Sequence, residues 1–363
     1  MAKPEELAVL IVDGMYYRDW ESVWVKHAYQ EPFAMFKFTC SEGMPLASNF
    51  AYIRIKPGDD VDITLAGEPA IQQGRVYSRQ VSYSARHHNI EIQGAARPHA
   101  LAQGSIAHKT GEFKDATFEQ ISKAVMQPFG INLKTLGQLS QDKFKRIHVQ
   151  QGETPWDLVE RIARSRGIVL GNDGSPNLLA MGSGADGGGG GSGGGGNAVI
   201  EGKNILEARE QLVDKRGAGG NLADASQLPG TDDESMAQIT HMPFHKMPIQ
   251  GGFGAVARPF LNYLTMGEVP SRVPDLKHRN TQEDWARNNE QVHLDVVVQG
   301  WLCPAGGLWK VGTKVYVKSP MLIMDRDLWL KSATFTQDNQ SGTRTSLELV
   351  DTLGENTSVE PSS

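Results

Sequence analysis

The sequence contains few cysteines and no excess of positive charge. Cys40 and Cys303 are the only cysteines among 363 residues, so a disulfide framework is excluded and a reducing compartment is expected. The formal net charge is −6, and no basic patch stands out along the chain. This charge balance argues against specific nucleic-acid binding.

Long apolar runs are missing as well. The N-terminal segment MAKPEELAVLIVDGMYYRDW lacks the order of basic, long apolar and small residues that marks a signal peptide. No apolar run is long enough to cross a bilayer, so membrane insertion is not expected. We predict a soluble protein made in the cytoplasm, with more than one domain, because a single core stops growing near ~250–300 residues.

Glycine, by contrast, is abundant. The tract GGGGGSGGGG at 187–196 has the composition of a flexible linker, native or engineered, and predicts a linker over 183–200. A second stretch, 217–257, is rich in Gly, Pro, Asp and Ser and shows little periodicity. It predicts a long irregular excursion on the surface.

Alternating apolar residues predict two β regions, at 1–98 and 201–354, each with short strands and regular turns. The alternating positions of one strand in each region are Val23, Val25 and His27, and then Val292, Leu294, Val296 and Val298. A polar tail follows at 355–363. The predicted fold class is α+β, mainly β, with two small β-barrel domains separated by α/β inserts.

The two β regions contain similar hairpins. The segments VYSRQVSYSARHHNIEIQG at 76–94 and WLKSATFTQDNQSGTRTSLELVD at 329–351 each combine a long strand, a polar turn and a returning strand. This likeness suggests an internal duplication.

Residues 99–146 predict a small α/β segment between the β regions. Thr117 and Gln120 have the spacing of a capping box, and Pro128 ends the helix. The apolar stripe of this helix consists of Phe118, Ile121 and Val125.

Residues 147–182 predict a compact strand–helix–hairpin unit. Thr154 and Asp157 form a second capping box, and Gly167 ends the helix. One helix face carries Trp156, Val159, Ile162 and Ala163, and the arginines off that face are Arg161, Arg164 and Arg166. An Asn-Asp-Gly turn then joins two strands within 168–181.

Several motifs fit functional patterns but lack the context that those functions need. The segment 252–257 fits a dinucleotide fingerprint, yet prolines flank it, and 307–314 half-matches a phosphate-binding loop but predicts a turn before a strand. His241 and His245 cannot share a helix face, because Pro243 lies between them. We therefore assign no catalytic, cofactor-binding or metal-binding residue, expect no cofactor and no enzymatic activity, and leave the partner interface unassigned.

The segment GETPW at 152–156 resembles the opening of a LysM module, a small fold that binds cell-wall glycan. If the LysM-like unit binds glycan, the groups involved lie around 152–154 and in the loop 171–176. If it is a structural module, Trp156 is mostly buried and anchors the helix to the hairpin at 168–181.

The order of parts resembles the baseplate hub proteins of contractile-tailed phages, closest to the Mu-like hub family. The last third carries the likeness at Gly300-Trp301, Gly307-Leu308-Trp309, Gly312 and the hairpin around Ser341-Gly342. EGKNIL at 201–206 resembles the strand that begins the closing barrel of that family.

The resemblance implies a structural protein of the virion tail that is assembled in the host cytoplasm. Such hubs form homotrimers in which the two β domains of each subunit alternate around a ring. The ring joins the tail tube protein to the central spike protein, contacts other baseplate proteins and lines the DNA passage. An acidic chain suits such a passage, because DNA must slide through it without sticking.

Two other functions stay open. One is a cell-wall-binding or wall-degrading tail protein, although no catalytic glutamate in a lysozyme-like helical domain is visible. The other is the hub part of a secretion-system spike protein. Those proteins normally continue into a long β-helical needle, and no needle is expected after Ser363.

Overall fold

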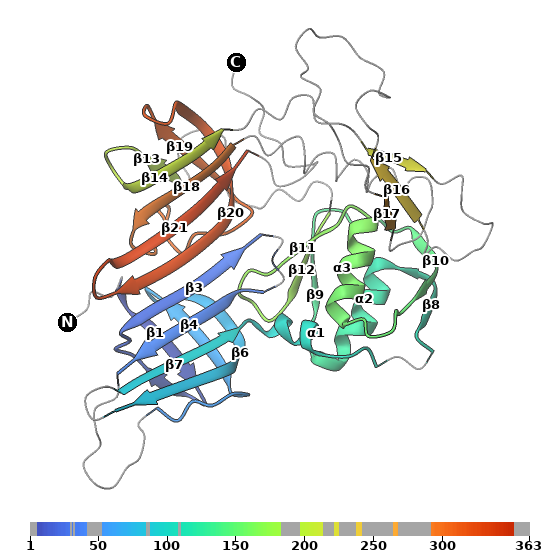
Figure 1. Ribbon diagram of the computed structural model, residues 1–363, viewed down its shortest axis with the longest axis horizontal. Helices are drawn as coiled ribbons and strands as arrows, with labels where there is room; N and C mark the ends of the chain where they lie inside the picture. Colours follow the sequence, from blue (N-terminus) through green and yellow to red (C-terminus); the bar gives the residue numbers. More distant parts are fainter. Residues whose placement is uncertain are drawn as a thin grey trace.

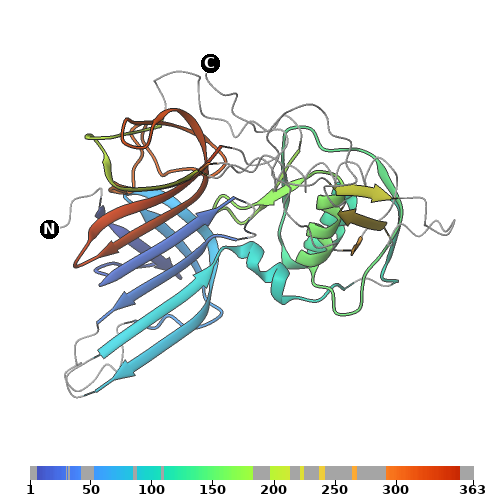
Figure 2. The same ribbon diagram turned by 45° about the horizontal axis from the view of Figure 1, so that its top comes forward.

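The structure is a computed structural model. It describes residues 6–29, 31, 33–41, 53–84, 88–107, 110–182, 197–212, 221–224, 237–241, 264–267 and 292–351. Figure 1 shows a large array of strands contributed by both ends of the chain and, beside it, a unit of helices and short strands. Figure 2 shows the same two parts side by side after rotation. The prediction of a mainly β protein is confirmed.

The N-terminal β region is an antiparallel sheet. Its strands are β1 (Ala8–Val12), β2 (Met15–Tyr17), β3 (Ser22–Ala28), β4 (Met35–Cys40), β5 (Asp60–Leu65), β6 (Glu68–Tyr83) and β7 (His88–Ala95). They lie in the order β3-β4-β7-β6-β5-β1-β2. The predicted inward positions of β3 are confirmed, because Val23, Val25 and His27 are all buried.

The C-terminal β region follows a related plan. Its strands are β13 (Ala198–Ile200), β14 (Ile205–Leu212), β18 (Val292–Gln299), β19 (Lys314–Ser319), β20 (Met324–Asp338) and β21 (Gly342–Val350). They lie in the order β14-β18-β21-β20, with β19 antiparallel to β20 and β13 parallel to β19. The predicted inward residues of β18 are all buried, at Val292, Leu294, Val296 and Val298.

One strand pair joins the two β regions. The first part of β20 pairs with β19, and residues 332–338 pair with β3, from Ser332 opposite Ala28 to Asp338 opposite Ser22. The result is one continuous sheet with one continuous hydrophobic core, to which Val25 and Phe36 contribute from one region and Trp301 and Phe335 from the other.

The expectation of two β-barrels therefore needs correction. Among the described strands, pairing closes neither region into a barrel, and the path of pairing runs from one region into the other. The physical reason is the length of β20, which extends beyond its partner β19 and offers the remaining edge to β3. Alternation in the sequence predicts the faces of strands, but it does not predict which edges meet.

The helices belong to an α/β unit between the two β regions. Its elements are η2 (Arg97–His99), α1 (Ala100–Gln103), β8 (Glu112–Thr117), α2 (Phe118–Met126), η3 (Gln127–Phe129), β9 (Leu133–Leu136), β10 (Lys143–His148), α3 (Pro155–Ser165), β11 (Val169–Gly171) and β12 (Leu178–Met181). β8 pairs with β10, and β12 pairs with both β11 and β9. The helices α2 and α3 pack between these sheets in a single core.

Local signals predicted both longer helices well. Thr117 accepts a hydrogen bond from the Gln120 backbone N–H, and Thr154 accepts one from the Asp157 backbone N–H, so both capping boxes form. α3 ends at Ser165, and Gly167 takes the left-handed conformation that a glycine accepts without strain.

The segment between β14 and β18 differs from the expectation. β15 (Asn221–Asp224), β16 (Ala237–His241) and β17 (Leu264–Gly267) form a small antiparallel sheet, and two of these strands lie inside the stretch 217–257 that was predicted to be irregular. β13 likewise occupies the end of the predicted linker 183–200. The glycine tract 187–196 and the tail 355–363 lie outside the described residues.

Trp156 is buried, as the structural interpretation of the LysM-like unit predicted, and it belongs to the same hydrophobic core as Ile168 and Leu170 of the hairpin. The Trp156 ring packs edge-on against Phe33, with centroids 5.7 Å apart. Phe33 lies in the connection between β3 and β4, so Trp156 anchors α3 to the N-terminal β region.

We expect Trp156→Ala to lower the free energy of unfolding by roughly 3–5 kcal/mol, the usual cost of deleting a buried large aromatic side chain. Tyr16→Ala is the control, because Tyr16 is exposed on β2 and its loss should cost less than about 0.5 kcal/mol. Chemical denaturation of both variants measures the difference. Equal stabilities would contradict the anchoring role.

Candidate junction and surface pocket

The turn between β11 and β12 is the clearest junction between the α/β unit and the N-terminal β region. The Gln72 backbone N–H donates to the Gly174 carbonyl at 2.7 Å, and the Ala34 backbone N–H donates to Asn172 Oδ1 at 3.4 Å. Both contacts join the turn to segments far away in the sequence. The loop 171–176, one of the two candidate glycan-binding segments, is therefore docked against a sheet.

Asn172 organises this turn from inside. Its side chain is only 2% exposed. Its Nδ2 donates to the carbonyls of Ser175 and Asn177, each at 2.9 Å, and its Oδ1 also accepts from the Gly174 N–H at 3.0 Å. The sequence predicted the turn from its Asn-Asp-Gly composition, but its docking partners had no local signal.

Gly174 lies at the point of closest approach. Its φ is +82°, and a Cβ at this position would lie 1.9 Å from the Ala70 carbonyl oxygen. Both the backbone conformation and the space require glycine here.

His27 is buried under the docked turn. Burial lowers the pKa of His27 to about 4, although nearby Asp173 and a hydrogen bond to the Ala70 carbonyl act in the opposite direction. Its ring packs edge-on against Phe335, with centroids 5.7 Å apart. His27 is therefore neutral at neutral pH and acts as a packing residue where β3, β20 and the turn meet.

The second candidate glycan-binding segment is held by a buried ion pair. The Arg161 guanidinium donates through Nε to Glu153 Oε1 at 2.6 Å and through its terminal NH2 group to Glu153 Oε2 at 3.0 Å. The same terminal NH2 group reaches the His148 carbonyl at 3.0 Å, and the Gln150 backbone N–H donates to Glu153 at 2.8 Å. Glu153 is the polar side chain of segment 152–154 that could best bind a sugar, and it already makes hydrogen bonds within the protein.

Two of the three arginines that were predicted to lie off the apolar face of α3 are not exposed to solvent. Arg161 and Arg166 are buried, and the Arg166 guanidinium lies 4.0 Å from the centroid of the Phe144 ring. Arg164 is exposed and pairs with Glu160. Helical periodicity predicts that an arginine is exposed to solvent. An arginine can nevertheless be buried where it pairs with a carboxylate or packs on the face of an aromatic ring.

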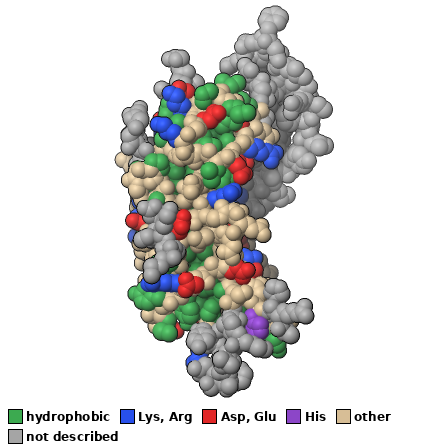
Figure 3. Space-filling view, turned by 90° about the vertical axis from the view of Figure 1, so that its left-hand side faces the viewer, with side chains coloured by type: hydrophobic (Ala, Val, Ile, Leu, Met, Phe, Trp, Pro, Cys, Tyr) green, Lys and Arg blue, Asp and Glu red, His purple; other side chains and the backbone are tan. Residues whose placement is uncertain are grey.

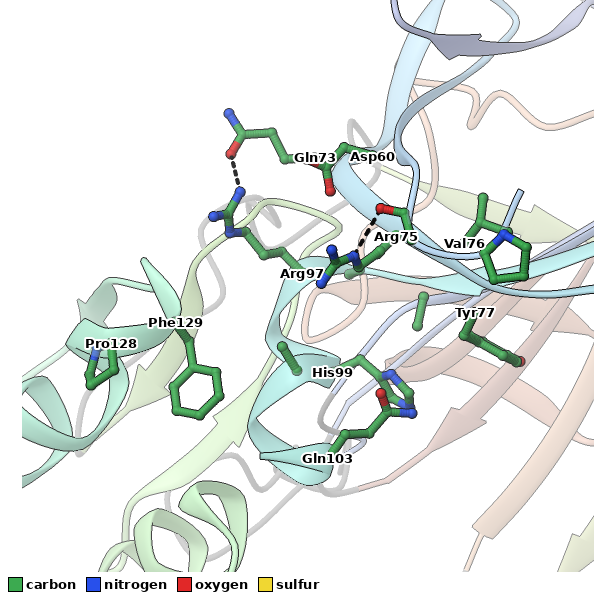
Figure 4. Close-up of a pocket in the computed structure, with 15 residues that line it drawn as sticks. Asp60, Gln73, Arg75, Val76, Tyr77, Arg97, His99, Gln103, Pro128 and Phe129 are labelled. Carbon is green, nitrogen blue, oxygen red and sulfur yellow. Dashed lines mark hydrogen bonds between the residues drawn. The ribbon is translucent and has the colours of Figure 1, made fainter. Parts of the chain in front are cut away.

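A pocket of about 600 Å³ opens where β6 meets η2, α1 and η3. Figure 4 shows Arg75 and Arg97 near its mouth, with Arg75 donating to the Gly58 carbonyl at 3.1 Å and Arg97 donating to Gln73 at 3.5 Å. Asp60 is the acidic residue among those lining it. One carboxylate beside two arginines offers no pair of acids for general acid–base hydrolysis.

Aromatic rings line part of the pocket, at Tyr77, His99 and Phe129. The His99 ring packs against Phe33 at 4.8 Å and Tyr77 at 5.6 Å between centroids, and burial lowers the pKa of His99. The pocket forms only where the two units meet, which explains why no sequence motif predicted it.

Among the remaining sequence motifs, those within the described residues form no ligand-binding site. The segment 307–314 forms a turn that leads into β19, as predicted, with Gly307 and Gly312 at positive φ. His241 lies in β16, while His245 and 252–257 fall outside the described residues. Within the described part of the chain, no cluster of three or more potential metal ligands occurs. Cys40 and Cys303 are both buried and unpaired with each other.

None of the helices in the described residues is long and apolar enough to cross a membrane.

Two family models match the chain in succession. Residues 8–96 match the N-terminal domain of Mu phage baseplate assembly protein GpP-like sequences, and residues 99–181 match the second domain of baseplate hub protein gp44-like sequences. The baseplate hub protein gp44 of Escherichia phage Mu is 19% identical over 360 residues, which span 94% of this chain and 86% of the relative.

Solved structures show the same fold. The 43 kDa tail protein of prophage MuSo2 from Shewanella oneidensis matches with a TM-score of 0.75 and 23% identity, over 95% of this chain and 98% of that one. A tail protein from Neisseria meningitidis MC58 matches with a TM-score of 0.70 and 17% identity, over 95% and 96% of the two chains. The c3393 protein of E. coli, a component of the type VI secretion system, matches with a TM-score of 0.57 and 10% identity, over 97% and 79%.

Two glycine variants measure the docking of the β11–β12 turn. Gly152 and Gly174 share a φ of +82°, but a Cβ on Gly152 would meet nothing within 4 Å. Gly152→Ala should cost about 1–2 kcal/mol of unfolding free energy for its left-handed backbone alone. Gly174→Ala should cost at least ~2 kcal/mol more, because the turn must move off Ala70. Equal costs in chemical denaturation would show that the turn is not docked.

The lowered pKa of His27 predicts a pH-dependent stability. The unfolded chain binds a proton on this histidine near pH 6.5, whereas the folded chain does so only near pH 4. Stability is therefore lost as the pH falls from about 6.5 to about 4, by roughly 3 kcal/mol for this group. In urea titrations, the stability advantage of wild type over His27→Gln should shrink across this range. A pH-independent difference would contradict the assignment.

Proposed function

We propose that the chain is a hub protein of the Mu-like phage baseplate family, which its matches to two baseplate family models and to a hub protein of phage Mu support, and that it assembles as a homotrimeric ring in the tail. The ring joins the tail tube protein to the central spike protein and contacts other baseplate proteins. Its lumen is the passage for DNA. The chain works without a cofactor and without catalysis, in the virion tail after assembly in the host cytoplasm.

A repeated strand order carries this proposal. The N-terminal region runs β3-β4-β7-β6-β5-β1 across the sheet, and the C-terminal region runs β14-β18-β21-β20-β19-β13. The strands also follow one another in the same chain order. The pairing directions agree except at the last pair, which is antiparallel for β1 with β5 and parallel for β13 with β19.

The repeat extends to a local irregularity. The register of β6 against β7 shifts between Val76 and Ser78, and that of β20 against β21 shifts between Leu330 and Ser332. Because β-bulges sit at defined positions and bend a strand, a shared bulge supports a common plan for the two regions. A chain with two equivalent regions allows three copies to match a partner of sixfold symmetry on one side and a threefold partner on the other.

The surface charge suits a passage for DNA. The net charge is −6. On the face in Figure 3, acidic and basic side chains are scattered among hydrophobic and polar ones without a continuous basic field. Such a surface does not hold the phosphate backbone.

The LysM-like unit fits a structural role in this hub. The Asn172 turn is docked on the N-terminal region, and Glu153 is paired with Arg161. These contacts count against the wall-binding alternative. The secretion-system alternative shares the hub fold, as the match to a type VI component illustrates, and differs in the partners that the hub would bind.

Mass measurement and glycan retention together test this function. At high concentration, or with the tube and spike proteins, the purified protein should have three times its chain mass of 39.6 kDa. It should neither bind chitin or peptidoglycan nor release soluble fragments from them. A monomer under all these conditions would refute the trimeric hub, and micromolar glycan binding would support the wall-binding alternative.

A further inference from the structure

Among the described strands, β2, β13, β14 and the last residues of β6 each have an edge without a strand partner, and the two longer of these edges are on β6 and β14. β5 pairs with β6 only as far as Arg75, while β7 pairs with the other edge of β6 as far as Tyr83. β14 pairs with β18 on one edge, and no described strand pairs with the other. In Figure 1, β14 and the β6–β7 hairpin lie toward opposite ends of the strand array. Open edges of this length can each accept another strand.

Exposed apolar side chains gather on these two strands. Most of the large apolar side chains that are exposed in the described residues lie on them, at Tyr77, Val81 and Tyr83 of β6 and at Leu206 and Leu212 of β14. Tyr83 is 81% exposed and Leu212 is 59% exposed. Such side chains beside an open edge favour the docking of a further strand.

Within the chain, the equivalent edge is already occupied. The shared bulge places residues 78–83 of β6 at the positions of residues 332–337 of β20. In β20 that stretch pairs with β3, and Ser332, Ala333 and Phe335 become buried. In the repeated strand order, the equivalent of β3 is β14. The described residues therefore contain one copy of the junction, in which β3 pairs with β20. They also contain the two strands of a second copy, β14 and β6, which do not pair with each other within the chain.

We propose that β14 of one copy pairs antiparallel with residues 78–83 of β6 in a second copy, and so repeats between subunits the β3–β20 junction found within each chain. This proposal rests on the trimeric hub proposed above and names the contact that closes it. Because each chain offers one β14 edge and one β6 edge, the pairing is head-to-tail, and in the trimer proposed above three such contacts close the ring.

The register follows from the internal junction. Lys26 of β3 lies opposite both Thr334 of β20 and Met35 of β4. Met35 of β4 pairs with Ala95 of β7, and His293 of β18 pairs with Val350 of β21. Ala95 and Val350 are equivalent, because each lies opposite the residue of β6 or β20 that is two positions before the bulged residue. Gln211, which lies opposite His293, is therefore the equivalent of Lys26. Since Gln80 is the equivalent of Thr334, Gln211 lies opposite Gln80 of the second copy.

Two charged side chains support this register. Arg79 Nε and Glu210 Oε1 are buried without a hydrogen-bond partner among the described residues, while the terminal NH2 group of Arg79 donates to the Ile53 carbonyl at 3.3 Å. In the register above, Arg79 lies opposite Leu212 and Glu210 lies opposite Val81, so the two charges are diagonal neighbours on one face. A diagonal pair is within reach of long side chains. Burial raises the pKa of Glu210, although Arg326 of the same chain acts in the opposite direction, and a guanidinium facing Glu210 from a second copy would lower this pKa further.

Engineered disulfides test the pairing directly. Under mild oxidation, Gln80→Cys with Gln211→Cys should produce covalent dimers and trimers on a non-reducing gel, which neither single variant forms beyond a dimer background. The matched positive control is Lys26→Cys with Thr334→Cys, which places the same pair inside one chain. Tyr16→Cys with Gln211→Cys tests the rival edge β2 and should remain uncrosslinked.

The outcomes separate this inference from the proposed function. If the wild type has the mass of a trimer and the internal control closes, but the Gln80–Gln211 variant does not crosslink, the strand pairing is wrong and the trimer stands. If the wild type is a monomer with and without the tube and spike proteins and no crosslink forms, both fall. Crosslinking of the Tyr16 variant instead would assign the contact to β2.

Charge reversal provides a second measurement. Arg79→Glu and Glu210→Arg should each weaken self-association by about tenfold or more, and the double reversal should restore it. Glu207→Arg is the control, because Glu207 lies on the other face of β14, beside Arg344, and should have a smaller effect. A double reversal that is as weak as the two single variants combined would overturn the Arg79–Glu210 contact and its register.

Discussion

The pairing of β20 with β3 is the contact on which the rest of the architecture depends. It joins residues 22–28 to residues 332–338 and merges the cores of two regions that lie at opposite ends of the chain. Because main-chain hydrogen bonds fix both the distance and the register of the strands, the orientation of one region on the other has little freedom. The α/β unit uses this fixed frame. Its β11–β12 turn reaches β6 at Gln72, and Val169 and Met181 pack against Tyr29 and Trp329 of the two regions.

The features that could be predicted from sequence are those with local physical causes. Thr117 and Thr154 predicted helix starts because a capping box needs only four residues, and Val23 and Val25 predicted a buried face because side chains alternate along a strand. The burial of Arg161 had no such signal, since it depends on Glu153 folding back beneath the helix. Strand alternation gave no information on which strand edges meet, so two separate β-barrel domains were expected, whereas one continuous sheet runs through both regions.

In the unit at 147–182, which resembles a LysM module in sequence, local signals and distant contacts determine different features. Its capped helix and its Asn-Asp-Gly turn form as the sequence predicts, yet the turn carries Gly174 into van der Waals contact with Ala70 and places Asn172 under the sheet. A glycan would have to compete with contacts between segments over a hundred residues apart. Local sequence therefore determines the shape of this unit, while its surroundings determine which of its surfaces remain accessible.

The charges beside the two open edges determine which edges pair in the proposed assembly. Arg79 on β6 and Glu210 on β14 each have a buried charged atom next to an open strand edge. Inward-pointing charges of this kind make pairing with an unmatched strand unfavourable. Two β14 edges brought together would place carboxylates against each other, and two β6 edges would do the same with guanidinium groups, so both twofold arrangements carry a repulsive cost. Only the pairing of β14 with β6 joins opposite charges. This asymmetry makes the contact between copies head-to-tail, because each junction uses one edge of each kind, and in the proposed trimer three such contacts complete the ring.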